Sequence, residues 1–204
     1  MVKVLKFGGS SLADAEHFKK VAQIIKEEKE RKYVVVSAPG KRHNKDEKIT
    51  DLLYQCYDLS VKNQDINPIF VKIIDRYNEI IKGLDIELSL DKEYEEIKNN
   101  ILNTKNKDYI ASRGEYLNGI ILANYIGFTF VDAKDMILFN EDGSFNPEGT
   151  DISVYNTLKD IEHAVVPGFY GALPNGLIKT FSRGGSDITK IGQTSQVFLW
   201  PIPG

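Results

Sequence analysis

The 204-residue sequence has little cysteine and histidine and no long hydrophobic run, the features of disulfide-rich, metal-binding and membrane proteins. Its one cysteine, Cys56, excludes an internal disulfide framework and agrees with a reducing compartment such as the cytoplasm. The three histidines, His17, His43 and His163, are scattered without metal-ligand spacing. No hydrophobic run approaches the roughly 20 residues of a membrane span, and the apolar run at 2–7 is too short for a signal peptide. The sequence therefore predicts a soluble, cytoplasmic protein with neither a metal centre nor a membrane segment.

The sequence also has no large excess of charge of either sign, because its formal net charge is only -3. Such a balance gives no field that would draw nucleic acid or an anionic membrane, so neither is expected as a partner. Basic residues gather in one place, the polar segment 38–48, which contains Lys41, Arg42, Lys45 and Lys48. This segment is too polar to become ordered by apolar burial. Two interpretations stay open: a solvated surface loop, or a lid that brings cations to an anionic ligand.

The beginning of the chain has the pattern of a βαβ unit. Residues 2–7 are rich in β-formers, a glycine loop follows at 8–11, and apolar residues then recur at helical spacing between residues 18 and 31. Residues 33–37 form a continuous apolar run, which is typical of a parallel strand buried on both faces. We therefore predict an α/β fold, a three-layer αβα sandwich around a mostly parallel sheet.

The rest of the chain adds helices first and strands later. Amphipathic patterns predict helices at 50–59, 68–84, 91–102 and 109–126, and the region 60–107 is expected to be a helical insertion beside the sheet. Gly114 lies inside the last of these helices, where glycine costs about 1 kcal/mol against alanine. The close approach of another group to that face of the helix, or the packing of a neighbouring helix, would account for it. Short strands are predicted at 128–131, 136–138, 164–169 and 177–181, a helix at 152–158 and a hairpin turn at 171–176.

Two glycine loops carry the candidate chemistry. In the second, residues 182–187, two glycines separate Arg183 from Ser186 and Asp187. Glycine amides and a guanidinium together suit a carboxylate or phosphate, although the loop taken alone is equally an ordinary turn. The first loop, at 6–11, fits neither the Walker A pattern nor the dinucleotide-binding pattern.

The first loop, Lys6-Phe7-Gly8-Gly9-Ser10-Ser11, resembles the amino-terminal signature of the amino-acid kinase family, in the form found in aspartate kinases. The resemblance spans residues 2–189, and further blocks follow in the family's order. They are Val36-Ser37-Ala38, Ile49-Thr50-Asp51-Leu52-Leu53, Ser112-Arg113-Gly114-Glu115, Gly168-Phe169 and Ser182-Arg183-Gly184-Gly185-Ser186-Asp187.

The resemblance implies ATP-dependent phosphorylation of the side-chain carboxylate of L-aspartate, the first step of the aspartate-derived pathway to lysine and threonine. It implies ATP and Mg²⁺ as cofactors, and homo-oligomers in the full-length family. Lys6 is expected at the transferred phosphoryl group, helped by the Gly8, Gly9 and Ser10 amides and a helix terminus behind them, and Asp187 is expected to position Lys6 or the substrate ammonium. The substrate-binding residues implied are Ser37, Thr50, Glu115, Phe169, Arg183, Gly184 and Ser186, with Arg183 on the α-carboxylate and Glu115 on the ammonium.

The last residues differ from the rest in composition. Residues 191–204 contain no charged residue, whereas 27% of the chain is charged, and they hold the only tryptophan and two of the seven prolines. We expect residues 1–189 to be the amino-terminal part of an amino-acid kinase catalytic domain and 190–204 to be an atypical tail. The nucleotide-base contacts and the regulatory ACT domains of the family are not expected in this chain. An alternative to the kinase is therefore an inactive remnant that binds aspartate or a partner subunit.

Overall fold

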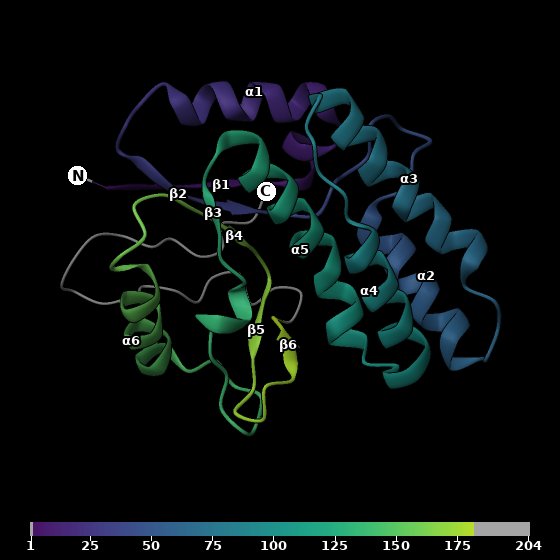
Figure 1. Ribbon diagram of the computed structural model, residues 1–204. Coiled ribbons are helices and arrows are strands. Elements are labelled where there is room, and N and C mark those ends of the chain that lie inside the picture. Colours follow the sequence, from purple (N-terminus) through teal and green to yellow (C-terminus); the bar gives the residue numbers. More distant parts are fainter. Residues whose placement is uncertain (1, 182–204) are drawn as a thin grey trace.

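The computed structural model describes residues 2–181, and its centre is a four-stranded parallel sheet (Figure 1). The strands are β1 (Lys3–Phe7), β2 (Arg31–Val36), β3 (Thr129–Phe130) and β4 (Ala164–Pro167), in the spatial order β1-β2-β4-β3. The register is regular, since Tyr33–Val36 pairs residue by residue with Ala164–Pro167. The predicted parallel sheet and α/β class are confirmed.

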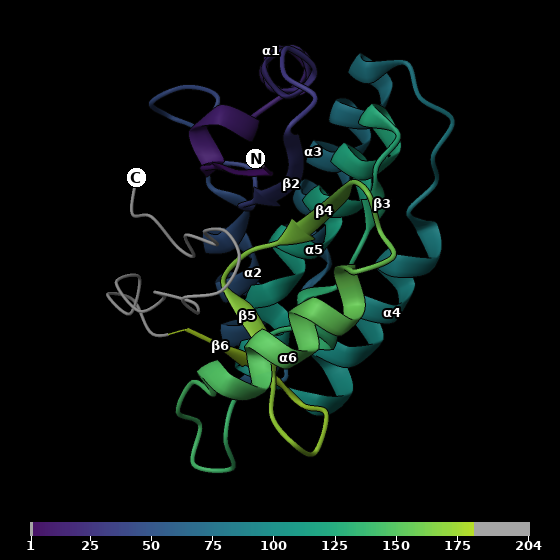
Figure 2. The same cartoon turned by 90° about the vertical axis from the view of Figure 1, so that its left-hand side faces the viewer.

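Alternating valines on the central strands contact two separate cores, one on each face of the sheet. Val34, Val36 and Val165 join a cluster that includes α1 (Ala15–Lys26) and α5 (Lys107–Ile126). Val35 and Val166 join the other cluster, with α6 (Pro147–Leu158) and the antiparallel hairpin of β5 (Tyr170–Ala172) and β6 (Ile178–Thr180). Figure 2 turns the second face toward the viewer, with α6 in front and α2 to α5 behind it. Both faces of the sheet are therefore covered, as an apolar strand pattern requires.

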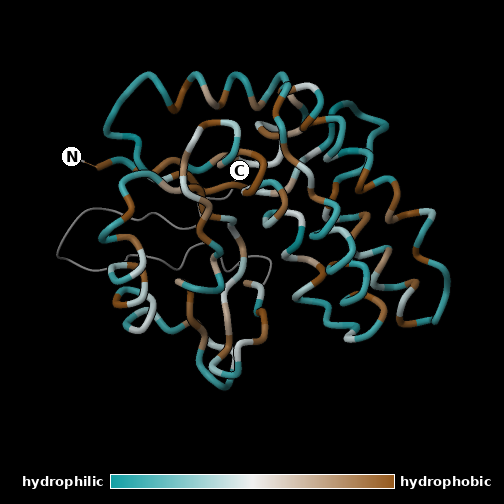
Figure 3. The backbone as a smooth tube through the Cα atoms, viewed as in Figure 1, coloured by the Kyte–Doolittle hydropathy of each residue, from teal (hydrophilic) through white to brown (hydrophobic). Residues whose placement is uncertain are grey.

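The helices beside the sheet are α2 (Ile49–Val61), α3 (Asn67–Leu84) and α4 (Asp91–Thr104), which pack with α5 (Figure 1). Their apolar residues point into the shared core, for example Phe70, Ile73 and Ile80 of α3. Figure 3 shows the same division along the chain, with hydrophilic stretches on the outer turns and hydrophobic residues in the strands. The predicted helices of this region are all present.

Three predicted elements differ from the structure. The first helix ends at Lys26, because Arg31 already begins β2 and its guanidinium bonds back to the Ile24 carbonyl and to Glu28. Helix α6 begins at Pro147 rather than at 152, since the Asn146 side chain accepts a 2.8 Å hydrogen bond from the Gly149 N–H and proline suits the first helical position. Residues 136–138 are not a strand: they follow the 3₁₀ turn η2 (Ala133–Asp135), and Leu138 makes one isolated bridge to Ala172.

No helix within residues 2–181 is long and apolar enough to cross a membrane. The second glycine loop and the tail at 190–204 lie outside the described residues.

Candidate functional site

A pocket of about 470 Å³ opens at the carboxyl ends of β1 and β2. This edge is where ligands bind in open parallel sheets, because the loops that follow adjacent strands diverge there. The pocket collects most of the predicted site residues that the structure describes. Those in its wall are Lys6, Gly8, Gly9, Ser10, Ser37, Thr50 and Glu115, and segment 38–48 contributes Ala38, Pro39, Gly40, Lys41 and Lys48.

Two loops form the floor of the pocket and touch each other through glycine backbone. The Gly40 N–H donates to the Gly9 carbonyl at 2.8 Å. A Cβ on Gly9 would lie 2.7 Å from the Ala38 carbonyl oxygen, and one on Gly40 would lie 2.7 Å from the Gly9 carbonyl carbon. Only glycine at both positions permits this approach.

The helix expected directly behind the first glycine loop begins later than predicted. Gly9–Leu12 forms a short 3₁₀ turn, η1, in which the Ser11 N–H donates to the Gly8 carbonyl at 3.1 Å. Helix α1 begins only at Ala15, where the Asp14 side chain accepts a 3.0 Å bond from the His17 N–H. The donors nearest the pocket are therefore loop and 3₁₀ amides, and not the terminus of a long helix.

Three lysines of the described part of the chain line the pocket. Lys6 is the half-buried penultimate residue of β1, and burial lowers its pKa. Lys41 and Lys48 come from the two ends of the basic segment. The other two cations of that segment do not line the pocket: Arg42 pairs with Asp46 and Glu79, and Lys45 is exposed. The segment thus divides its cations between the pocket and an ion-pair network.

Among the residues that the structure describes, Glu115 is the one carboxylate lining this pocket, and it lies on α5 with 7% of its surface exposed. Burial raises the pKa of Glu115 to about 7, and hydrogen bonds from the backbone of Glu115 and Ala38 oppose the rise. Its Oε2 atom has no hydrogen-bond partner within residues 2–181. A buried carboxylate oxygen left without a donor is rare and suits a cationic group that enters the pocket.

The glycine before Glu115 explains how α5 comes so close to the pocket. A Cβ on Gly114 would lie 2.7 Å from the Cβ of Ala38 and 3.4 Å from Ile49 Cγ2. Gly114 is therefore closely approached, as its position predicts, both by a pocket loop at Ala38 and by helix α2 at Ile49. Leaving this position without a side chain allows Glu115 to lie beside the pocket loop.

Asn118 is a residue of the site region that the sequence interpretation missed. It is fully buried, and its Nδ2 atom donates to the Ser37 carbonyl at 2.7 Å, which fixes the loop after β2. The sequence feature that could have identified Asn118 is its spacing: it follows Glu115 by three residues and so lies on the same face of α5. Nothing in that spacing identifies the partner, which depends on how α5 packs on the sheet.

Phe169 follows β4 at the same edge of the sheet but does not line the pocket. Its φ of 79° is unusual for a side chain of this size, and its carbonyl accepts a 2.9 Å bond from the Phe181 N–H. This bond anchors the end of the described chain at the carboxyl end of β4. The other predicted substrate residues, Arg183, Gly184 and Ser186, and the predicted catalytic Asp187 lie outside the described residues.

A metal site is not formed by the part of the chain that the structure describes. Within residues 2–181 there is no group of three histidine, cysteine, aspartate or glutamate side chains placed to hold a metal ion. The pocket wall offers lysines, backbone amides and hydroxyls, and Glu115 alone as a carboxylate. This donor set suits anions rather than a bare divalent cation.

Comparison with known proteins gives consistent matches. The model of the Amino acid kinase family matches residues 1–191. Aspartokinase 3 of Bacillus subtilis is 34% identical over 206 residues, which cover 92% of this chain and 44% of the relative. The crystal structure of Clostridium acetobutylicum aspartate kinase superposes with a TM-score of 0.87 at 48% identity, over 90% of this chain and 42% of that one.

E. coli aspartokinase III, solved in complex with aspartate and ADP, shares the fold with a TM-score of 0.72 at 20% identity, over 92% of this chain and 45% of that one. The chain thus spans less than half the length of each of these relatives. The matched residues include both the sheet and the pocket at its carboxyl edge. The chain belongs to the amino acid kinase family, and the relatives named above are aspartokinases.

Proposed function

We propose that this chain carries the phosphate-binding and aspartate-binding part of an aspartokinase, which transfers the γ-phosphoryl group of ATP to the side-chain carboxylate of L-aspartate. The observation that carries the proposal is a pocket whose described wall has three lysines and one buried, partly unpaired carboxylate. Such a pocket is complementary to a ligand that has both anionic groups and an ammonium group. The aspartokinase relatives support the choice of aspartate.

The reaction needs positioning more than it needs a base. The aspartate side chain has an ordinary pKa near 3.9, so at pH 7 the attacking carboxylate is already ionised. One of its oxygens forms a bond to the γ-phosphorus while the bond to the bridging oxygen of ATP breaks. That electron pair leaves with ADP, and the product is 4-phospho-L-aspartate. The protein must hold two anions together and stabilise the charge between them.

We assign Lys6 and the glycine loop to the phosphate end of the ligand. The Lys6 side chain and the Gly8, Gly9 and Ser10 backbone line the same pocket, and Lys41 adds a cation from the opposite loop. An anion beside Lys6 favours its charged form and so counteracts the effect of burial on its pKa. Backbone amides at glycine can approach phosphate oxygens because no Cβ stands in the way.

We assign Glu115 to the ammonium of the amino acid. Ionisation of its carboxyl is unfavourable in the empty pocket, since burial raises its pKa to about 7. An ammonium group within a few ångströms favours the charged form, so substrate binding releases the proton that Glu115 holds. Arg183 on the α-carboxylate, Gly184 and Ser186 beside it, and Asp187 near Lys6 complete the proposal from the family resemblance.

Mg²⁺ is expected to arrive with ATP, since the family resemblance implies a metal-nucleotide complex. Within residues 2–181 no group of carboxylate or histidine side chains is placed to hold it, and phosphate oxygens and water are ligands that Mg²⁺ prefers. Mg²⁺ there would neutralise part of the phosphate charge, and the lysines would neutralise the rest.

Trapping the product with hydroxylamine tests the proposal. Acyl phosphates react to give a coloured hydroxamate, so the chain is mixed with ATP, Mg²⁺, L-aspartate and hydroxylamine. We expect hydroxamate from the wild-type chain and none from Lys6→Ala, while Lys45→Ala, an exposed lysine outside the pocket, retains the signal. No hydroxamate from the folded wild-type chain would refute the kinase proposal and favour the non-catalytic remnant.

A further inference from the structure

Arg76 is a buried arginine in the middle of α3. Its side chain is only 4% exposed, and Ile73, Tyr77 and Ile80 surround it on the buried face of the helix. Burying a guanidinium costs several kcal/mol unless its donors are paired. Leucine or methionine would serve helix packing at no such cost, so the contacts of Arg76 indicate what it does.

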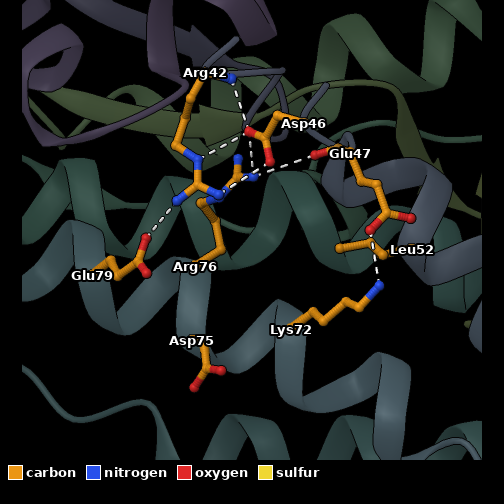
Figure 4. Close-up of a pocket in the computed structure, with 8 residues that line it drawn as sticks. All are labelled: Arg42, Asp46, Glu47, Leu52, Lys72, Asp75, Arg76 and Glu79. Atoms are coloured by element: carbon orange, nitrogen blue, oxygen red, sulfur yellow. Dashed lines mark hydrogen bonds and ion pairs between the residues drawn. The ribbon is translucent and has the colours of Figure 1, made fainter. Parts of the chain in front are cut away.

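Within residues 2–181, the Arg76 guanidinium has three acceptors, and all belong to the loop between β2 and α2. Figure 4 shows two of the residues that supply them, Asp46 and Glu47. Nη1 donates to the Gly40 carbonyl at 3.0 Å. Nη2 donates to Asp46 Oδ2 at 2.6 Å and to the Glu47 carbonyl at 3.3 Å. Gly40 lies near the start of the loop and Glu47 near its end, so one side chain holds both ends.

Each end held by Arg76 is next to a lysine of the pocket. Lys41 follows Gly40, and Lys48 follows Glu47, and both lysines line the pocket with Lys6. The Gly40 N–H also donates to the Gly9 carbonyl in the first glycine loop. The contacts of Arg76 therefore fix the second loop relative to both α3 and the first loop.

The charges around Arg76 are paired with one another. Asp46 accepts from Arg42 Nε at 2.9 Å and Nη2 at 3.0 Å, and these bonds, with the Arg76 charge, hold the pKa of Asp46 well below its usual range. Arg42 also bonds Glu79 at 2.6 Å, and Lys72 bonds the Glu47 carboxylate at 2.9 Å (Figure 4). The network is therefore a structural tie and not a vacant anion site.

We propose that Arg76 is a positioning residue: it closes the 38–48 loop against α3 and so holds Lys41 and Lys48 at the phosphate end of the pocket. This inference rests on the proposed function, and Arg76 itself touches no substrate. Arginine suits the task because its planar fork reaches three acceptors at once, whereas a lysine ammonium cannot span them.

Two measurements on the whole chain test this, with Arg76→Gln as the variant and Lys72→Gln as the matched control. Lys72 lies one helical turn earlier on α3, carries the same charge and does not contact Gly40 or Asp46. Calorimetry with inorganic triphosphate and Mg²⁺ measures binding at the pocket, and amide hydrogen exchange reports the opening of residues 38–48.

We expect Arg76→Gln to bind triphosphate about tenfold more weakly, because displaced binding groups lose affinity. Amide exchange should accelerate in residues 38–48 and not along the rest of the chain. In both affinity and exchange rate, Arg76→Lys should fall between the wild type and Arg76→Gln. Lys72→Gln should match the wild type within about twofold in affinity, since an exposed ion pair contributes little. Unchanged exchange in the loop of Arg76→Gln would overturn the proposal, whatever the affinity.

Asp46→Asn serves as a second variant if Arg76→Gln has no cooperative thermal transition. It weakens the same contact from the loop side, and the same loop-confined acceleration is expected. If the wild-type chain does not bind triphosphate, the proposed phosphate role of the pocket fails. Hydrogen exchange alone then decides whether Arg76 holds the loop: acceleration confined to 38–48 upholds the tie, and its absence refutes it.

Discussion

Replacing Glu115 with glutamine should stabilise the chain in alkaline solution. Burial raises the pKa of Glu115 from 4.5 to about 7, so the folded chain keeps a proton that the unfolded chain has already lost. At about 1.4 kcal/mol for each pKa unit, ionising this carboxyl in the folded chain costs about 3 kcal/mol. Glutamine has nearly the same shape and no charge, so Glu115→Gln avoids that cost.

The sign of the effect fixes its pH window. Between about pH 4.5 and 7 the folded state binds more protons at Glu115 than the unfolded state, so rising pH removes stability from the wild type. The free energy of unfolding of Glu115→Gln should therefore exceed that of the wild type by about 2 to 3 kcal/mol at pH 8.5. At pH 4.5 the two proteins should be nearly equal, since the carboxyl is protonated in the folded state.

Urea denaturation followed by circular dichroism at both pH values measures this difference. Glu95→Gln, an exposed glutamate on α4, is the control and should change stability by less than about 0.5 kcal/mol at either pH. A Glu115→Gln variant no more stable than the wild type at pH 8.5, or equally stabilised at both pH values, would refute the assignment of Glu115 as a buried, uncompensated carboxyl.

Two further predictions concern packing. Gly40→Ala would place a Cβ 2.7 Å from the Gly9 carbonyl carbon, so it should lower the free energy of unfolding, measured with urea, by about 1 to 3 kcal/mol. Gly8→Ala, whose Cβ would meet nothing within 4 Å, should lower it by less than about 1 kcal/mol. Equal losses of stability would contradict the close approach of the two loops. Cys56 is fully buried, and burial raises the pKa of its thiol to about 12. A thiol reagent such as DTNB should therefore label Cys56 only in denaturant. Rapid labelling of the folded chain would contradict its place in the core.

The sequence predicted the parts of the fold that depend on local pattern. Residues 33–36 are apolar without interruption, and they form the central strand β2. Gly127 ends α5 with a φ of 76°, as a C-terminal glycine should. The helix boundaries that were wrong, at Lys26 and Pro147, depend on an arginine contact and on an asparagine cap.

The candidate site was predictable to the extent that strand ends and motifs determine it. The family resemblance predicted Lys6 and Ser37, and both line the pocket because β1 and β2 run parallel and end at the same edge of the sheet. Arg76 and Asn118 were missed because their partners are backbone carbonyls far away in the sequence. The division of the basic segment between pocket and ion pairs likewise depends on where α3 lies.

The separation of the pocket into a cationic side and a Glu115 side is the central claim, and comparing L-aspartate with succinate tests it most directly. Succinate carries both carboxylates but lacks the ammonium group. In calorimetric titrations at pH 8, the wild-type chain should bind L-aspartate at least about tenfold more tightly than succinate, and Glu115→Gln should abolish that preference. Equal affinity of the wild type for the two ligands, or a preference that survives in Glu115→Gln, would contradict the account.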